Sequence, residues 1–200
     1  ARKTIRKAVS ADFNNDGFLD IFGFTTGDHY QEKDVSEVDL LLINQNGNTF
    51  KAVDIPEPRK NSPNHGGFVI DINNDGYTDI VSLDEEEGFA TYPLKNIEGK
   101  KFSLLKKGLN PDVKKYRIHD GDAGDLNNDG FQDMVISIHL PKKDKFKNKE
   151  NLRIIYGDGD FNFDNNKITK TGNSWLSKKR VKEISDDFDA EVLFGTSNIN

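Results

Sequence analysis

Short apolar runs alternate with polar turns along this chain, and the runs are too short to form typical helices. Three of them directly follow acidic stretches: IFGF (21–24), IVSL (80–83) and MVIS (134–137). Each acidic stretch is preceded by another short run: KAVSA (7–11), GGFVI (66–70) and DGDAG (120–124). Runs of this length without a 3.6-residue period predict β-strands rather than helices.

A second landmark, a glycine turn that leads into phenylalanine, follows each of these strand pairs. The three turns are NQNGNTF around Gly47, NIEGKKF around Gly99 and YGDGDFNF around Gly159. A further apolar run precedes each turn: DLLLIN (39–44), FATYPL (89–94) and LRIIYG (152–157). The unit is therefore strand, acidic loop, strand, variable loop, strand, glycine hairpin, strand. Four short strands in a repeat of roughly 40–60 residues are typical of a propeller blade.

We therefore predict an all-β fold, a single β-propeller domain of four-stranded antiparallel blades over residues 1–200. The repeats are expected at about 5–60, 61–115, 116–172 and 173–200. The last unit, EISDDFDAEVLFG (183–195), aligns with the first unit but lacks its acidic loop. Because three and a half blades do not close a ring easily, and no methionine opens the chain, we expect part of a larger propeller of about seven blades. A compact four-bladed ring is the alternative.

The acidic loop is the most regular feature of the chain. DFNNDGFLD (12–20) returns as DINNDGYTD (71–79) and as DLNNDGFQD (125–133), so the copies start 59 and 54 residues apart. Each copy has Asp or Asn at positions one, three, five and nine, and glycine at position six. Calcium prefers six to eight oxygen ligands, and glycine allows the sharp turn that brings them together. In the first copy the expected ligands are Asp12, Asn14, Asp16, the carbonyl of Phe18, and Asp20.

Two other interpretations of the loop were weighed. An EF-hand needs a glutamate at position twelve and flanking helices, but position twelve is Gly23, Ser82 or Ile136 and the flanks are strand-like. An ordinary Asn–Asp–Gly turn without metal is the second alternative. Taking the nine loop aspartates from the 34 acidic residues leaves 25, against 28 Lys and Arg, so the net charge of −6 is concentrated in the loops. Three divalent cations would offset it, and clustered carboxylates would otherwise repel one another.

The repeated pattern resembles the FG-GAP and VCBS repeats, a family of calcium-loop β-propellers that includes the head of integrin alpha chains and many large bacterial surface proteins. The resemblance implies that each loop joins the first two strands of a blade and holds calcium, about three ions per chain. The implied ligands in the second and third loops are Asp71, Asn73, Asp75, the Tyr77 carbonyl and Asp79, and Asp125, Asn127, Asp129, the Phe131 carbonyl and Asp133.

The function expected from this pattern is a calcium-stabilised module for adhesion, recognition or surface assembly, with calcium structural rather than catalytic. Because extracellular modules bind calcium weakly, with dissociation constants of roughly 10⁻⁴–10⁻³ M, such sites fill outside the cell, and we expect a secreted or cell-surface location. The alternatives are a purely structural repeat and an enzyme acting on acidic polysaccharide, like the rhamnogalacturonan lyases that this blade type resembles. No HExxH, GxSxG or phosphate-binding glycine loop supports an enzyme.

Other residues give weaker indications. His65 and His119 each lie six residues before a loop aspartate, where the first unit has Arg6. We interpret them as repeat-matched structural histidines, with a place in a central channel as the alternative. The basic segment 141–153 and the acidic segment 25–39 are the expected binding loops, for a protein or acidic glycan partner. We expect no nucleic-acid partner. The chain has no cysteine and no long apolar run, which excludes disulfides and a transmembrane segment.

Overall fold

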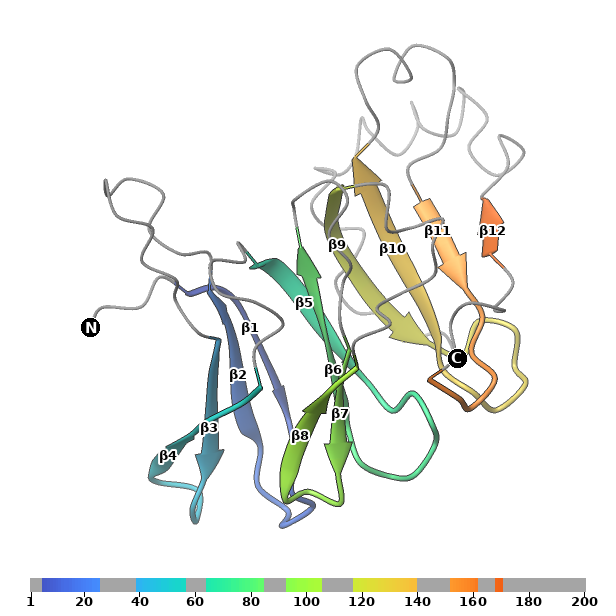
Figure 1. Ribbon diagram of the computed structural model, residues 1–200. Helices are drawn as coiled ribbons and strands as arrows, with labels where there is room; N and C mark the ends of the chain where they lie inside the picture. Colours follow the sequence, from blue (N-terminus) through green and yellow to red (C-terminus); the bar gives the residue numbers. More distant parts are fainter. Residues whose placement is uncertain are drawn as a thin grey trace, which may run out of the picture.

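Three four-stranded antiparallel sheets make up the computed structural model, and they stand side by side along the chain (Figure 1). The structure describes the following residues: 5–25, 39–56, 64–84, 93–105, 117–139, 152–161 and 168–170. Within these segments there is no helix, and so none that could span a membrane. The predicted all-β class and the four-stranded antiparallel units are confirmed, whereas the predicted fourth unit (173–200) lies outside the described residues.

Each sheet follows the order of its strands in the sequence. The first sheet contains β1 (Ile5–Ala11), β2 (Asp20–Thr25), β3 (Leu40–Asn44) and β4 (Phe50–Val53). The second contains β5 (Asn64–Ile70), β6 (Asp79–Asp84), β7 (Pro93–Ile97) and β8 (Lys101–Leu104). The third contains β9 (Arg117–Gly124), β10 (Asp133–His139), β11 (Leu152–Ile155) and β12 (Ile168–Lys170). Such a meander needs only short hairpin connections between neighbouring strands.

The third strand of the second sheet differs from its predicted position. The run FATYPL suggested a strand ending at Leu94, but β7 continues to Ile97 and pairs Ile97 with Lys101. The pairing with β8 extends the strand, since the tight turn at Gly99 brings the two chains together directly after Ile97. Gly47, Gly99 and Gly159 all have positive φ angles, between 68° and 84°, as the predicted glycine turns require.

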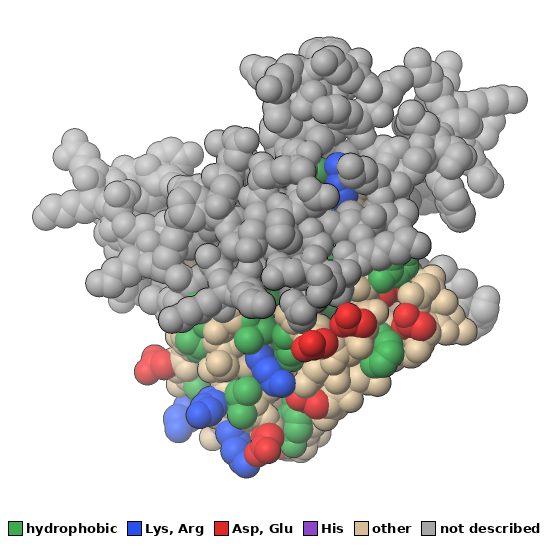
Figure 2. All heavy atoms as spheres, turned by 45° about the vertical axis from the view of Figure 1, so that its right-hand side comes forward, with side chains coloured by type: hydrophobic (Ala, Val, Ile, Leu, Met, Phe, Trp, Pro, Cys, Tyr) green, Lys and Arg blue, Asp and Glu red, His purple; other side chains and the backbone are tan. Residues whose placement is uncertain are grey.

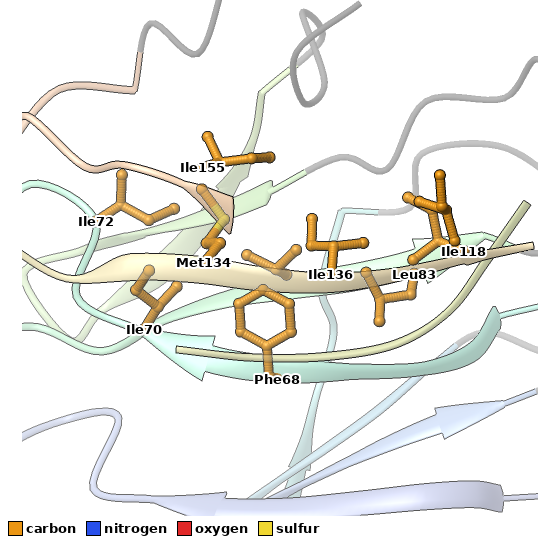
Figure 3. Close-up of a cluster of buried hydrophobic side chains, with 10 residues drawn as sticks. Phe68, Ile70, Ile72, Leu83, Ile118, Met134, Ile136 and Ile155 are labelled. Carbon is orange, nitrogen blue, oxygen red and sulfur yellow. The ribbon is translucent and has the colours of Figure 1, made fainter. Parts of the chain in front are cut away.

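Two hydrophobic cores lie between the sheets. The first joins Phe13, Phe22, Phe24, Leu41 and Ile55 of the first sheet and its connections to Ile80 and Leu94 of the second. The second core joins Phe68, Ile70, Ile72, Val81 and Leu83 to Ile118, Met134, Ile136, Ile138 and Ile155 of the third sheet (Figure 3). Neighbouring residues on β6 point into different cores, which explains why its apolar run is continuous rather than alternating.

The first strands of the sheets lie innermost and in close contact, because β5 packs against both β1 and β9. A methyl group at Gly121 would lie 2.7 Å from the Phe68 ring and 2.9 Å from the Val135 carbonyl oxygen, so this glycine permits the close approach of β9 to β5. Lys7 on β1 and Asp120 on β9 form an ion pair of 2.6 Å, although β5 lies between these strands in the chain. The innermost strands therefore converge, as they do around a propeller axis.

Gly121→Ala should lower the free energy of unfolding by about 1–3 kcal/mol, because the added methyl group meets backbone and a packed ring. Gly124→Ala, in the same strand, meets no atom within 4 Å. It should be neutral or stabilise slightly, because alanine restricts the unfolded chain. Urea denaturation of both variants checks the prediction, and equal stabilities would contradict the packing described here.

Candidate metal centre

The three acidic loops occupy equivalent places, each joining the first and second strands of its sheet. They lie at the same end of the three sheets, the lower end in Figure 1. In Figure 2 the surface of this lower end carries acidic side chains next to hydrophobic ones. The predicted position of the loops within the unit is therefore confirmed.

Backbone conformation explains the residue types at positions four and six. Asn15, Asn74 and Asn128, at position four, have φ angles of 57°, 55° and 61°. The glycines at position six have φ angles of 83–92°. Asparagine and glycine are the residues that adopt positive φ most readily, so the NNDG sequence specifies a tight turn in each loop.

Hydrogen bonds from the turn hold the carboxylates at positions one and five. In the first loop the Asp12 carboxylate accepts from the amides of Asp16 (3.0 Å) and Gly17 (2.8 Å). The Asp16 carboxylate accepts from the amide of Phe18 (2.9 Å) and from Nδ2 of Asn14 (2.8 Å). The corresponding bonds in the other two loops measure between 2.8 and 3.2 Å. One local geometry thus recurs three times.

The aspartate at position nine has a different role, because it begins the second strand and is buried. Asp20, Asp79 and Asp133 are each 0% exposed. The Asp79 carboxylate accepts from the amide of Ile72 at position two of its own loop (3.0 Å) and from the amide of Asn96 at the end of β7 (2.7 Å). Asp20 and Asp133 make the matching pairs of bonds. This carboxylate therefore joins the loop to the third strand.

Electrostatics at this position favour a nearby cation. Burial raises the pKa of Asp79 to about 7, and the negative charges of Asp75 and Asp71 act in the same direction, against the lowering effect of its two amide donors. Burial likewise raises the pKa of Asp20, with further contributions from Asp16 and Asp12. A cation within the loop would offset both effects, because it stabilises the charged carboxylate.

The oxygens of each loop fit a hard cation only as a mixed set. Within the described segments, no three Asp, Glu or His side chains gather tightly enough to hold a metal by themselves. Amide and carbonyl oxygens are therefore needed as well, and these are ligands that calcium accepts. In the second loop Oδ1 of Asn73, at position three, is buried and has no hydrogen-bond partner. An unsatisfied buried oxygen among carboxylates is the site's clearest sign of fit to a cation.

The residues at position seven lie at the turn, where only their carbonyl groups were expected to act. The Phe18 side chain is 42% exposed, and its ring approaches the hairpin glycine Gly47 of its own sheet. Phe131 approaches Gly159 in the same way. These rings therefore pack the loop against the hairpin.

The histidine positions have a shared backbone feature. The pairing of the innermost strand with its neighbour skips Arg6, His65 and His119 in the three sheets, as at a β-bulge. The side chains of His65 and His119 lie outside the described residues, as do residues 26–38 and 141–151 of the two predicted binding loops. The repeated bulge explains why these positions recur at a fixed distance from the loops.

Three amide side chains at the loops were not expected from the sequence. Nδ2 of Asn44 donates to the Leu19 carbonyl (3.1 Å), Nδ2 of Asn96 donates to the Thr78 carbonyl (3.1 Å), and Oε1 of Gln132 accepts from the amide of Asp71 (2.9 Å). Asn44 and Asn96 both lie three residues before the hairpin glycine, a repeat that was visible in the sequence.

We predict a pH dependence of stability that originates at Asp79. Without divalent cations, the unfolded chain loses this proton near pH 4, whereas the folded chain keeps it to about pH 7. The folded state then binds more protons, so the free energy of unfolding should fall, on the order of 1–3 kcal/mol, as the pH rises from about 4 to 7. Asp79→Asn should reduce this slope, leaving the part that comes from Asp20.

Denaturant titrations in chelator at several pH values measure the slope. Asp54→Asn, which removes an exposed carboxylate outside the loops, is the matched control. An unchanged slope in Asp79→Asn would show that Asp79 does not retain its proton.

Comparison with known proteins agrees with this geometry. The model of the FG-GAP-like repeat family matches residues 12–82, from the first loop through β2–β5 and the second loop into β6. No curated protein matches the chain. The third loop repeats the same hydrogen bonds beyond the matched region. Residues 12–82 thus match an FG-GAP-like repeat, the repeat that the loops predicted.

Proposed function

We propose that this protein is a calcium-stabilised β-propeller module for extracellular recognition, adhesion or surface assembly. Calcium, about three ions per chain, is structural in this proposal. The observation that carries it is the recurrence of one loop geometry at the same end of three sheets. In the second loop Oδ1 of Asn73 is also unsatisfied, whereas its counterparts on Asn14 and Asn127 accept from the amides of Asp16 and Asp129.

The residues that would hold calcium in each loop are those at positions one, three, five and nine, with the carbonyl oxygen at position seven. In the second loop these are Asp71, Asn73, Asp75, Asp79 and Tyr77. Bound calcium would supply positive charge that cancels the repulsion among the carboxylates. The loop itself contributes the tight turn and the Asp79 carboxylate, which accepts a hydrogen bond from the amide of Asn96 on the third strand. Ion binding and sheet packing would therefore stabilise each other.

The outer faces of the described sheets favour further blades beside these three, and we propose a larger ring of about seven. Ile80 and its β7 partner Leu94 are buried against the first sheet. Ile21 and its β3 partner Leu42 occupy the matching positions on the first sheet, because Ile21 and Ile80 each lie nine residues after the first aspartate of their loops. Ile21 and Leu42 are only half-buried. At the other end, position two of the third loop, Leu126, is 52% exposed. Its counterparts in the first two loops, Phe13 and Ile72, are 1% and 3% exposed.

Recognition is proposed at the end of the sheets opposite the acidic loops. The connections from β2 to β3 and from β10 to β11 leave from that end and contain 14 and 12 residues, numbers 26–39 and 140–151. Long connections on a rigid scaffold are common binding sites. The second of these is rich in lysine, which suits a protein or glycan partner with acidic groups.

Calcium should raise the free energy of unfolding by about 1 kcal/mol per site at about 1 mM, or roughly 3 kcal/mol in total, because it binds the folded loops. The triple variant Asp16→Ala, Asp75→Ala, Asp129→Ala should lose both this response and the bound metal. Thermal unfolding with and without chelator, together with metal analysis, measures both quantities.

A matched control removes three exposed aspartates outside the loops: Asp54, Asp158 and Asp160. It should keep the calcium response, since it changes the same total charge but no proposed ligand. If chelation has no effect on the parent chain and no calcium is bound, the loops are turns without metal and the extracellular proposal loses its main support.

Partner binding has its own test. Replacing Lys142, Lys143, Lys145, Lys147 and Lys149 by glutamine should weaken binding to acidic polysaccharides, most strongly at low salt, because charge attraction is screened by salt. A glycan array at two ionic strengths measures this. Unchanged binding at low salt would reject the basic connection as the contact.

A further inference from the structure

Adjacent acidic loops are joined to each other by amide side chains. Asn96, at the end of β7, is 1% exposed. Its Nδ2 donates both to the Phe13 carbonyl of the first loop (2.7 Å) and to the Thr78 carbonyl of the second loop (3.1 Å). Its Oδ1 accepts from the amide of Gly99 (2.9 Å), so both ends of the side-chain amide are engaged. A buried side chain with this many partners has a single orientation.

These bonds form a continuous connection between two buried carboxylates. The amide of Phe13 donates to Asp20 (3.0 Å), and the Phe13 carbonyl accepts from Asn96. The backbone amide of Asn96 donates in turn to Asp79 (2.7 Å). Asp20 and Asp79 are the position-nine carboxylates of the first and second loops. The backbone of Phe13 and the residue Asn96 therefore link the two carboxylates.

Among the described residues, the equivalent residue in the first sheet makes no such connection. Asn44 donates its backbone amide to Asp20 (2.8 Å) and its Nδ2 to Leu19 (3.1 Å), and its Oδ1 accepts from Gly47 (2.7 Å). All of these partners belong to the first sheet and its own loop. Asn44 thus has the local role of Asn96 without the contact to a neighbouring loop.

The third sheet uses a different residue for the same purpose. Gly157 takes the place of the asparagine, and its amide donates to Asp133 (2.8 Å). The connection to the second loop comes instead from Gln132, whose Oε1 accepts from the amide of Asp71 (2.9 Å). Side-chain amides therefore join each pair of neighbouring loops. The buried Asn96 and the exposed Asn15, which donates to the Gly76 carbonyl (3.0 Å), join the first and second loops, and Gln132 joins the second and third.

We propose that Asn96 is a positioning residue that couples cation binding in the first loop to cation binding in the second. The inference rests on the proposed calcium function. A cation in the first loop orders Asp20 and Phe13, and through Asn96 it orders Asp79, so the second cation finds part of its site already positioned. Ordering by one ligand that benefits another produces positive coupling.

Terbium luminescence reports the second loop through Tyr77 at position seven, because the first and third loops have phenylalanine there. Tyr156 lies next to Gly157 at the third loop and can sensitise an ion there, so the second-loop signal is taken as the part of the emission that Tyr77→Phe removes. Terbium is titrated into the parent chain and into Asp16→Ala, which removes a first-loop carboxylate whose described bonds stay within that loop. Loss of cation binding in the first loop should weaken terbium binding to the second loop by about fivefold.

In the Asn96→Ala background, Asp16→Ala should weaken terbium binding to the second loop by no more than about twofold. The remaining effect comes from the exposed hydrogen bond that Nδ2 of Asn15 donates to the Gly76 carbonyl. Asn44→Ala is the matched control and should keep the fivefold shift. Asn96→Ser, which keeps an oxygen for Gly99 but is too short to reach Phe13, gives the same test if Asn96→Ala does not fold.

The outcomes separate this inference from the proposed function. The coupling would be overturned if Asp16→Ala changed the terbium affinity of the second loop equally with and without Asn96, or did not change it in the parent chain. Either result would leave calcium binding intact. Absence of any terbium or calcium binding to the parent chain would overturn the proposed function itself, and the coupling with it.

Discussion

The buried carboxylate at position nine of each loop is the interaction on which the rest of this structure depends. It begins the second strand, accepts a bond from position two of the loop, and accepts another from the end of the third strand. Loop, hairpin and sheet are therefore joined at one side chain. Because an unpaired buried charge is strongly unfavourable, these two amide donors are requirements of the fold, and the proposed cation would stabilise the same carboxylate further.

The same arrangement accounts for the packing between sheets. Position nine fixes where the second strand starts, and so it fixes which of its residues face the preceding sheet and which face the following one. Ile80 enters one core and Val81 the other because they directly follow Asp79. The glycine at position 121 then lets the innermost strands approach until the Phe68 ring fills the space. Each sheet has two buried faces only when a neighbour covers both, which is why Ile21 and Leu42 at one end of the array are only half-buried and Leu126 at the other end is exposed.

Differences among the three units are as informative as their likeness. Asn44, Asn96 and Gly157 occupy one position, yet they connect to the loops in three ways. The unit that lacks the asparagine gains Gln132 instead. Repetition therefore conserves the local turn, whereas the connections between loops vary with the neighbouring sheet.

The sequence by itself determined the strands, the hairpins and the candidate ligands, because each depends on residues close together in the chain. Asparagine and glycine adopt positive φ most readily, and carboxylates spaced within one turn lie near one another. Asn73 and Asp79 were identified on this basis. Only the tertiary structure decided that Asp79 is buried with a raised pKa, that Lys7 reaches Asp120, and that Asn96 joins two loops. These features depend on partners 17 to 113 residues away, and no local pattern specifies which sheet will lie beside which.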